Sequence, residues 1–209
     1  TTLWQCTHLQ YLDLGGNPLG QLPAAIGQLT HLQELNLANT QLSDLPETLG
    51  QCSHLLGLDL SFNKLSQLPE VIGQLTHLQT LYLVTNQLSN LPAAFGQLTH
   101  LQELDMEDNH FRHFPEVLGQ CTHLQKLGIG FNQLSQLSPT IGQLIHLWKL
   151  DLTSNQLNHL PEALGQCTEL QTLFLPHNQL SDLPAALGQL THLQYLYLTN
   201  NQLSELPTA

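Results

Sequence analysis

Leucines and polar residues follow each other along this chain in a pattern that repeats every 23 residues. The segment HLQELNLANTQLSDLPETLGQCS, which begins at His31, returns as HLQTLYLVTNQLSNLPAAFGQLT from His77. Each copy has the form L-x-x-L-x-L-x-x-N-x-L-x-x-L-P, and so many matches in one register cannot arise by chance. Residues 1–8 are the tail of an earlier copy, and nine copies open at Leu9, Leu32, Leu55, Leu78, Leu101, Leu124, Leu147, Leu170 and Leu193.

The spacing of the leucines within a copy predicts its local structure. In L-x-L, as at Leu35-Asn36-Leu37, the two leucines lie on one side and the residue between them on the other, which is typical of a short strand. The following LPxxIG segment, as in 22–27, turns the chain across the back, since proline restricts the backbone and glycine frees it. One copy cannot bury its own leucines, so we expect successive copies to stack around a continuous core.

An asparagine follows the predicted strand in nearly every copy. A buried amide at this position would satisfy backbone groups of the turning chain, because unpaired buried polar groups are unfavourable. Two copies depart from the pattern: Thr40 holds the asparagine position, and Ser138 holds the proline position with Pro139 one residue late. The asparagines are Asn17, Asn63, Asn86, Asn109, Asn132, Asn155, Asn178 and Asn201.

With these motifs the chain resembles leucine-rich repeat proteins over essentially its whole length. The form LxxLxLxxNxLxxLPxxIGxLxxL resembles Ras-suppressor-like repeats, plant Ras-group repeats and many bacterial repeats, and the monotonous Gln and His usage resembles bacterial effectors such as those of Legionella. The resemblance implies an α/β solenoid, a right-handed horseshoe with a concave parallel β-sheet and short turns, 3-10 or α segments on the convex side. It also implies that other proteins bind on the concave face. Residues 1–209 are interpreted as a single domain, and we expect a longer parent protein because neither end carries a polar cap.

Charge narrows the range of partners. Four Lys and Arg stand against 16 Asp and Glu, which gives a net charge of -12, and only 10% of the residues are charged against a typical ~25%. Because such a chain repels phosphate, nucleic acid and anionic membrane surfaces are poor partners. No apolar run approaches the ~18 residues that span a bilayer, and the first residues lack the features of a signal peptide. We expect no membrane insertion.

Cysteine usage favours a cytoplasmic location. All four cysteines occupy one position of the repeat, where other copies have leucine, so each is interpreted as a core residue. The nearest pairs lie two turns apart, which places their Cα atoms ~10 Å apart, beyond the ~7 Å limit for a disulfide. We expect no disulfides and a reducing compartment, either the cytosol of the source cell or, for a secreted effector, that of a host. The cysteines are Cys6, Cys52, Cys121 and Cys167.

Histidine forms a column of its own. Eight of the 12 histidines stand immediately before the opening leucine, with Glu169 interrupting, and stacking would bring their imidazoles to strand spacing. A metal-responsive or pH-responsive function is one interpretation, because imidazole binds metals and titrates near pH ~6.5. The other is duplication of a polar surface residue along with its repeat, which we favour. The column is His8, His31, His54, His77, His100, His123, His146 and His192.

Repetition argues against an enzyme. Cys-x-His recurs, as at Cys52/His54 and Cys121/His123, whereas a catalytic dyad is needed once and needs an accessible thiolate. The glycines punctuate turns and form no phosphate-binding loop. We therefore expect no catalytic residues, no cofactor and no metal.

The strand positions that point away from the core differ between copies and predict a binding surface. Four like charges in the fifth copy repel each other and destabilise the free protein unless something basic binds. Two lysines follow in the next copies, and aromatic residues, which are typical interface anchors, lie toward both ends. Exposed strands also carry polar residues and tyrosine without any partner, which is the alternative explanation. The predicted partner-binding residues are Tyr82, Glu103, Asp105, Glu107, Asp108, Lys126, Lys149, Phe174, Tyr195 and Tyr197.

The sequence thus predicts a scaffold that binds a partner protein, one with a basic patch, through the sheet. The histidine column leaves a metal-responsive or pH-responsive protein as an alternative. A designed or consensus repeat scaffold without a partner is another, although irregularities such as Thr40, Ser138 and Glu169 argue against idealised design.

Overall fold

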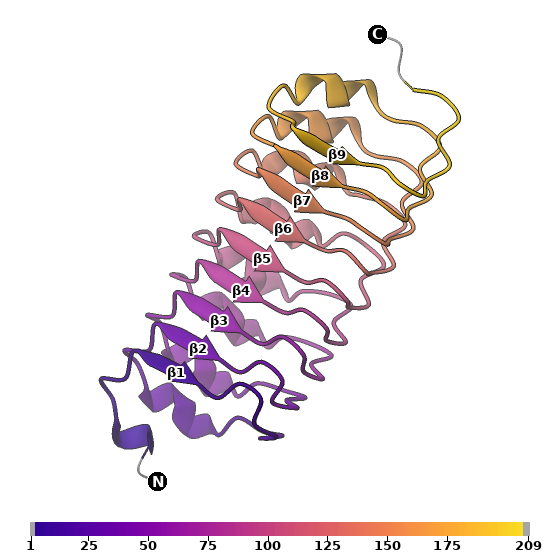
Figure 1. Cartoon of the computed structure of the whole chain (residues 1–209). Helices are drawn as coiled ribbons and strands as arrows, with labels where there is room; N and C mark the ends of the chain where they lie inside the picture. The colour runs from indigo at the N-terminus through magenta and orange to yellow at the C-terminus, as the bar shows by residue number, and fades with distance from the viewer. Residues whose placement is uncertain (1–2, 207–209) are drawn as a thin grey trace.

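The computed structural model describes residues 3–206 and shows a solenoid of stacked turns (Figure 1). Each complete turn contains a three-residue strand, a segment that leads to the back and a short 3-10 helix. The strands are β1 (Tyr11–Asp13), β2 (Glu34–Asn36), β3 (Gly57–Asp59), β4 (Thr80–Tyr82), β5 (Glu103–Asp105), β6 (Lys126–Gly128), β7 (Lys149–Asp151), β8 (Thr172–Phe174) and β9 (Tyr195–Tyr197). The 3-10 helices are η1 (Leu3–Gln5), η2 (Ala24–Gln28), η3 (Glu47–Gln51), η4 (Glu70–Gln74), η5 (Ala93–Gln97), η6 (Glu116–Gln120), η7 (Pro139–Gln143), η8 (Glu162–Gln166) and η9 (Ala185–Gln189).

Strands β1 to β9 form one parallel sheet in chain order. Each strand residue pairs with the residue one repeat later, as Leu35 pairs with Leu58, so the register is that of the repeat. The predicted parallel sheet with short 3-10 segments behind it is therefore confirmed. The strands begin one residue earlier than the L-x-L pattern indicated, because the hydrogen-bonded ladder already includes the amide of Glu34, which donates to the carbonyl of Gln10.

A continuous apolar core lies between the sheet and the 3-10 helices. The central leucines of β1–β8 are buried, and full burial of such a side chain contributes about 1.5–3 kcal/mol. Leu196 of β9 is exposed at the end of the stack. In the fifth turn Phe111 and Phe114 take leucine positions and are buried in the same core as Met106. Larger rings thus replace leucines there without interrupting the stack.

Buried asparagines satisfy backbone groups, as predicted, and link most turns to the one before. The prediction of a buried amide is wrong for Asn17, which is exposed in the first turn and donates to carbonyls of its own turn. Asn86 donates from Nδ2 to the carbonyl of Leu60 in the preceding turn (3.0 Å) and to that of Leu83 in its own turn (3.1 Å). Its Oδ1 accepts the amide of Leu65, also in the preceding turn (3.0 Å). Asn63, Asn109, Asn132, Asn155 and Asn178 are buried as well and make equivalent bonds.

The two irregular turns keep the fold by local substitutions. Buried Thr40 donates through its hydroxyl to the carbonyl of Leu37 (2.6 Å), which replaces one bond of the missing asparagine. Ser138 caps the following helix, because its Oγ accepts the amide of Thr140 (3.2 Å), and Pro139 then occupies the first helical position, where no amide is needed.

A left-handed residue precedes the asparagine of each turn, where the chain bends away from the sheet. In the first turn this residue is Gly16. In the later turns it carries a side chain, and an L-residue adopts the left-handed conformation at a cost in free energy. Phe62 and Phe131 (φ 57° and 52°) are aromatic examples and are about half exposed, at 56% and 53%. Their rings therefore lie beside the exposed face of the sheet. The backbone that carries them is strained.

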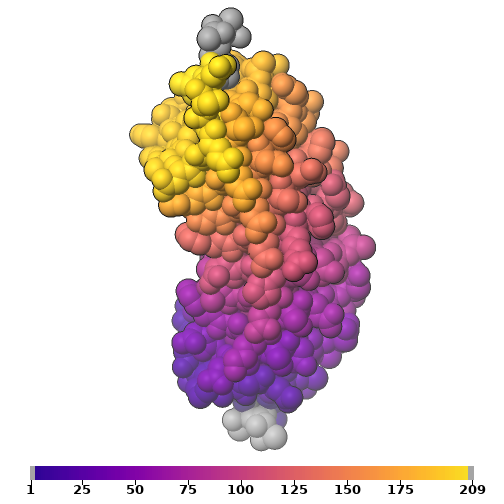
Figure 2. Space-filling model, turned by 90° about the vertical axis from the view of Figure 1, so that its right-hand side faces the viewer, coloured from indigo at the N-terminus to yellow at the C-terminus, as the bar shows by residue number. Residues whose placement is uncertain are grey.

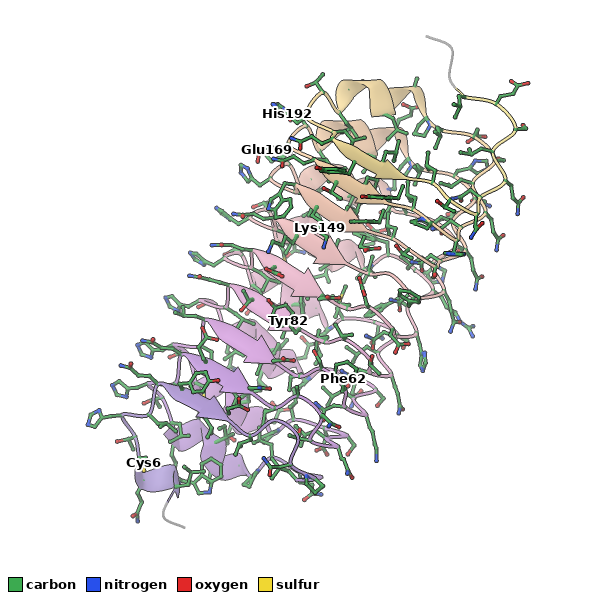
Figure 3. All side chains as sticks on the ribbon, viewed as in Figure 1. Cys6, Phe62, Tyr82, Lys149, Glu169 and His192 are labelled. Carbon is green, nitrogen blue, oxygen red and sulfur yellow. The ribbon has the colours of Figure 1, made fainter. Side chains whose placement is uncertain are left out.

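Three of the four cysteines lie in the core. Cys52, Cys121 and Cys167 are buried, and each Sγ donates to a backbone carbonyl of the preceding turn at 3.2–3.8 Å. Burial raises the pKa of these thiols to about 11 for Cys52 and Cys167 and about 12 for Cys121. The prediction of a core position is wrong for Cys6, which is exposed at the N-terminal end of the stack (Figure 3), because no described turn covers it.

The described part of the molecule is an elongated column with its first and last turns at opposite ends (Figure 2). Apolar side chains are exposed at both ends, as predicted, with Leu3 38% and Leu206 66% exposed. Among residues 3–206 no helix has the length and apolar character needed to cross a bilayer.

Candidate protein-binding surface

The outward side chains of β1–β9, with the outward residues just after each strand, make up one face of the molecule, here called the sheet face. Within β5, Leu104 is buried while its neighbours Glu103 and Asp105 are at least partly exposed, and β2, β4, β6, β7 and β8 alternate in the same way. Tyr82 and Lys149 mark this face in Figure 3. The strand residues predicted to bind a partner thus lie on one continuous surface.

The central feature of the sheet face is a small hollow over β5–β7, with a volume of about 50 Å³. Glycine at position 128 creates it, because a Cβ there would lie 2.7 Å from Oδ1 of Asp105. Lys126 closes one side and donates from Nζ to Oε2 of Glu103 at 2.9 Å. We call this the central hollow; it is lined by Glu103, Leu104, Asp105, Glu107, Lys126, Leu127, Gly128, Lys149 and Asp151.

Two carboxylates of the central hollow, those of Glu107 and Asp105, are held in an unfavourable environment. Partial burial, together with the nearby charges of Asp105 and Asp151, raises the pKa of Glu107 to about 7 against the opposing effect of Lys149. Burial likewise raises the pKa of Asp105. A group whose charge is destabilised in this way gains most from an added cation.

Asp105 also has a structural role. Its Oδ1 accepts the backbone amide of Glu107 at 3.1 Å, which closes the turn at the end of the strand. Asp59 and Asp151 accept the equivalent amides in their own turns at 2.9 Å. An aspartate therefore recurs at this position in several turns, whereas Glu107 is the side chain specific to the fifth turn.

The four predicted acidic residues of the fifth turn do not all line the same hollow. Glu103, Asp105 and Glu107 share the central hollow, but Asp108 lies outside its lining. Asp108 has a left-handed backbone (φ 54°), is exposed, and accepts a hydrogen bond from the hydroxyl of Thr85 at 2.9 Å. Asp108 therefore lies outside the hollow that the other three share, and its part in partner binding stays a prediction.

Three residues of this region were missing from the predicted set. Asp151 and Gly128 line the central hollow, and the ring of Trp148 lies under Lys126, with Nζ 5.5 Å from its centroid. A signal was present for Trp148, which interrupts a column that is otherwise almost all glutamine. The glycine could have been noticed as a missing side chain at an outward strand position.

Aromatic residues extend the sheet face from the central hollow toward β9. The rings of Phe174 and Tyr197 stack with centroids 4.6 Å apart, and Nζ of Lys149 lies 5.6 Å from the centroid of Phe174. Tyr195 and Tyr197 are 55% and 42% exposed. Lys149 therefore connects the acidic hollow with an exposed aromatic cluster.

Tyr82 belongs to a separate hollow of about 180 Å³ nearer the N-terminus. This hollow also forms over a glycine, Gly57, and the carboxylate of Glu34 occupies the space that a side chain at that position would fill. Burial raises the pKa of the Tyr82 hydroxyl, with Glu103 as the next cause. The predicted residues thus divide among a Tyr82 hollow, the central hollow and the β8–β9 aromatic cluster.

The histidine column lies on the opposite side of the strands from Phe62, where Glu169 and His192 are labelled in Figure 3. Neighbouring rings such as His100 and His123 stack with centroids 6.3 Å apart. In most turns Nδ1 bonds to a backbone carbonyl of the preceding turn, as His123 bonds to that of Thr99 at 2.8 Å. Since a carbonyl oxygen only accepts hydrogen bonds, Nδ1 carries the proton, and Nε2 is the acceptor nitrogen of the neutral ring.

The cysteine and the histidine of one Cys-x-His segment lie in different environments. Cys52 is buried with a raised thiol pKa, while the imidazole of His54 is bonded to the carbonyl of Thr30 on the surface. The two do not form a nucleophilic dyad. Among residues 3–206 no group of three or more His, Cys, Asp or Glu side chains is arranged to hold a metal ion.

Family models match nearly the whole chain. Residues 47–136 match a model described as "Leucine-rich repeat region", and residues 122–180 and 145–203 match one described as "Leucine rich repeat". Residues 7–50 match a model described as "Leucine Rich repeats (2 copies)". A search of curated protein sequences gives no match.

Solved structures share the fold. The leucine-rich repeat ectodomain of the plant receptor kinase GASSHO1/SCHENGEN3 from Arabidopsis thaliana, in complex with Casparian strip integrity factor 2, is 33% identical with a TM-score of 0.86 over 96% of this chain and 25% of that one. A leucine-rich repeat protein from Leptospira interrogans is 29% identical (TM-score 0.65; 98% and 70% covered), and an internalin from Listeria monocytogenes is 26% identical (0.69; 97% and 65%). The chain spans only a quarter of the length of the plant ectodomain. Its repeat register, parallel sheet and family matches together show that the chain belongs to the leucine-rich repeat proteins.

Proposed function

We propose that this chain is a protein-interaction module that binds a partner protein through its sheet face, and that the partner presents a basic segment next to an apolar one. The observation that carries the proposal is the central hollow, whose four carboxylates face only two lysines. One lysine, Lys126, is already paired with Glu103. Asp105, Glu107 and Asp151 therefore share Lys149, and a lysine or arginine from a partner would supply the missing positive charge.

The neighbouring aromatic cluster supports the apolar part of this proposal. Phe174, Tyr195 and Tyr197 lie next to the hollow in an arrangement that offers flat apolar area with polar tips, as interface anchors do. Nine strands at the usual spacing extend over about 40 Å, enough for an interface of ordinary size. The similar plant ectodomain was solved with a bound factor, which also supports a binding role.

We further propose that the module is not an enzyme, does not bind nucleic acid and works in a cytosol. The buried thiols with raised pKa support the first and third statements, and the net charge of -12 supports the second. The more specific form of the proposal is a bacterial effector that acts on a host protein in the host cytosol. The similarity to leucine-rich repeat proteins from Leptospira interrogans and Listeria monocytogenes supports this form.

The test is affinity capture from eukaryotic cytosol with three baits, followed by titration of the captured protein into each bait. The first bait is the unchanged chain and the second carries Glu103→Gln and Glu107→Gln in the central hollow. The third carries Glu47→Gln and Glu116→Gln, two exposed residues of η3 and η6 on the back. The two variants each replace two carboxylates, so they separate a local effect from a general electrostatic one.

We expect the unchanged and back-face baits to capture the same protein, and the sheet-face variant to bind it at least about tenfold more weakly. Equal binding by all three baits would contradict the proposal and would place the interface on another surface. Equal weakening in both variants would show a long-range charge effect and would also contradict it.

A further inference from the structure

A second polar surface lies away from the sheet face. Here called the downstream flank, it is formed by the segments that lead from the strands to the back, residues 64–68, 87–91, 110–114, 133–137 and 156–160. The strands of Figure 1 point toward this side, and Figure 2 views the molecule from it. Two of these segments read Q-L-S-x-L and two more differ from it at one position, but the fifth turn reads His110-Phe111-Arg112-His113-Phe114. The two phenylalanines are buried, and the other three side chains are exposed.

Positive charge gathers on the downstream flank although the chain as a whole is strongly acidic. It carries Arg112, the only arginine of the sequence, and Lys64, the only lysine outside the central hollow. None of its five segments contains an aspartate or a glutamate. Acidic residues return at the equivalent positions only in outer turns, at Asp44, Asp182 and Glu205.

The side chains of the fifth turn open a hollow on this flank. Ser89, His110, Arg112, His113 and Gln133 line a space of about 500 Å³, and each can donate hydrogen bonds. An adjoining space is lined by Arg112, His113, Gln133, Ser135 and Gln156. No carboxylate lines either of these two spaces. Glu116 lines a third, separate space toward the back, which His113 also borders.

Arg112 has no acidic partner. Its Nε donates to Oε1 of Gln133 in the next turn at 3.4 Å, and no ion pair of Arg112 occurs among residues 3–206. The imidazoles of His110 and His113 likewise have no hydrogen-bond partner within the described part of the chain. An arginine in this setting keeps most of the five donors of its guanidinium available for a ligand.

We propose that this hollow, centred on Arg112, binds a phosphate group. A phosphate monoester has three terminal oxygens, and donors from three successive turns, Ser89, Arg112 and Gln133, surround the space. Turns stack ~4.8 Å apart, so side chains of neighbouring turns can reach one tetrahedral anion. The site is independent of the sheet face and would give the module a second specificity, for a phosphorylated partner.

The test is a titration of the 15N-labelled chain at pH 7, followed by the NMR signals of the Arg112 Nε–H and the amides of residues 110–113. Inorganic phosphate, phosphoserine and glutamate are added in separate experiments. Arg112→Ser removes the guanidinium and restores the residue that other turns carry here, such as Ser89 and Ser135, so the fold is retained. Lys64→Gln, elsewhere on the flank, is the matched control for loss of one positive charge.

We expect saturable shifts with phosphate and phosphoserine, affinity at least about tenfold weaker in Arg112→Ser, and less than about twofold change in Lys64→Gln. Tighter binding of phosphoserine than of inorganic phosphate supports a phosphoprotein as the source of the group, and the reverse order supports free phosphate. Shifts that do not saturate, that persist in Arg112→Ser, or that glutamate reproduces at the same concentration would overturn the proposal.

Discussion

Glu107 is the residue in which the electrostatics of the sheet face are most evident. It is partly buried beside Asp105 and Asp151, and its pKa rises to about 7. In the unfolded chain the same carboxyl loses its proton near its ordinary pKa of about 4.3. Between these values the folded state binds more protons than the unfolded state, so this group lowers stability as pH rises from about 4 to 7. Above about pH 7 the destabilisation is complete.

We therefore predict that Glu107→Gln stabilises the protein above pH 7 by about 1–2 kcal/mol, after allowance for solvent screening, and has little effect near pH 4. Urea denaturation of the unchanged chain and the variant at several pH values measures the difference. Glu116→Gln on the back is the control and should change stability by less than about 0.5 kcal/mol. Equal stability of the two proteins at pH 8 would contradict the prediction, because it would show that the charged carboxylate of Glu107 does not lower the free energy of unfolding.

At the scale of elements, the buried asparagines join neighbouring turns through side-chain hydrogen bonds. Asn109 donates to the carbonyls of Leu83 and Met106 at 2.9 and 3.1 Å, and its Oδ1 accepts the amide of Leu88 at 2.9 Å. Alanine would leave the buried amide of Leu88 without its partner. It would also remove one bond from each of the two carbonyls, which keep a bond from Asn86 and Asn132 respectively.

We predict that Asn109→Ala lowers the free energy of unfolding by about 2–4 kcal/mol. The same change at Asn17, which is exposed in the first turn, should lower it by less than about 1 kcal/mol. Guanidinium denaturation of both variants makes the comparison. Similar losses at the two positions would mean that burial of the amide is not the source of the stabilisation.

At the scale of the whole molecule, the sequence predicts whatever depends only on the position of a residue within the repeat. A given position of the repeat has the same surroundings in every internal turn. The repeat therefore predicts the parallel register, the leucine core, the buried asparagines and the stacked histidines. The core prediction fails at Cys6 because an end position lacks the neighbouring turn that buries Cys52.

The site was predictable only in part, because its shape depends on contacts between different columns. The hollow over Gly128 is formed by side chains from two neighbouring turns, and the left-handed backbone of Asp108 keeps it out of that hollow. The contact between Lys126 and Trp148 likewise joins separate columns. Linear spacing gives the outward residues of the sheet face, whereas three-dimensional packing decides which of them meet.

The three lysines of the chain provide the most direct test of sheet-face binding. Lys126 and Lys149 line the central hollow, and Lys64 lies on the downstream flank. Acetylation of the free protein and of its complex with the captured partner, read by mass spectrometry, reports which lysines the partner covers. We predict that the partner protects Lys126 and Lys149 at least about fivefold and leaves Lys64 unchanged, in keeping with burial of the interface centre. Protection of Lys64 alone, or of none of the three, would contradict sheet-face binding.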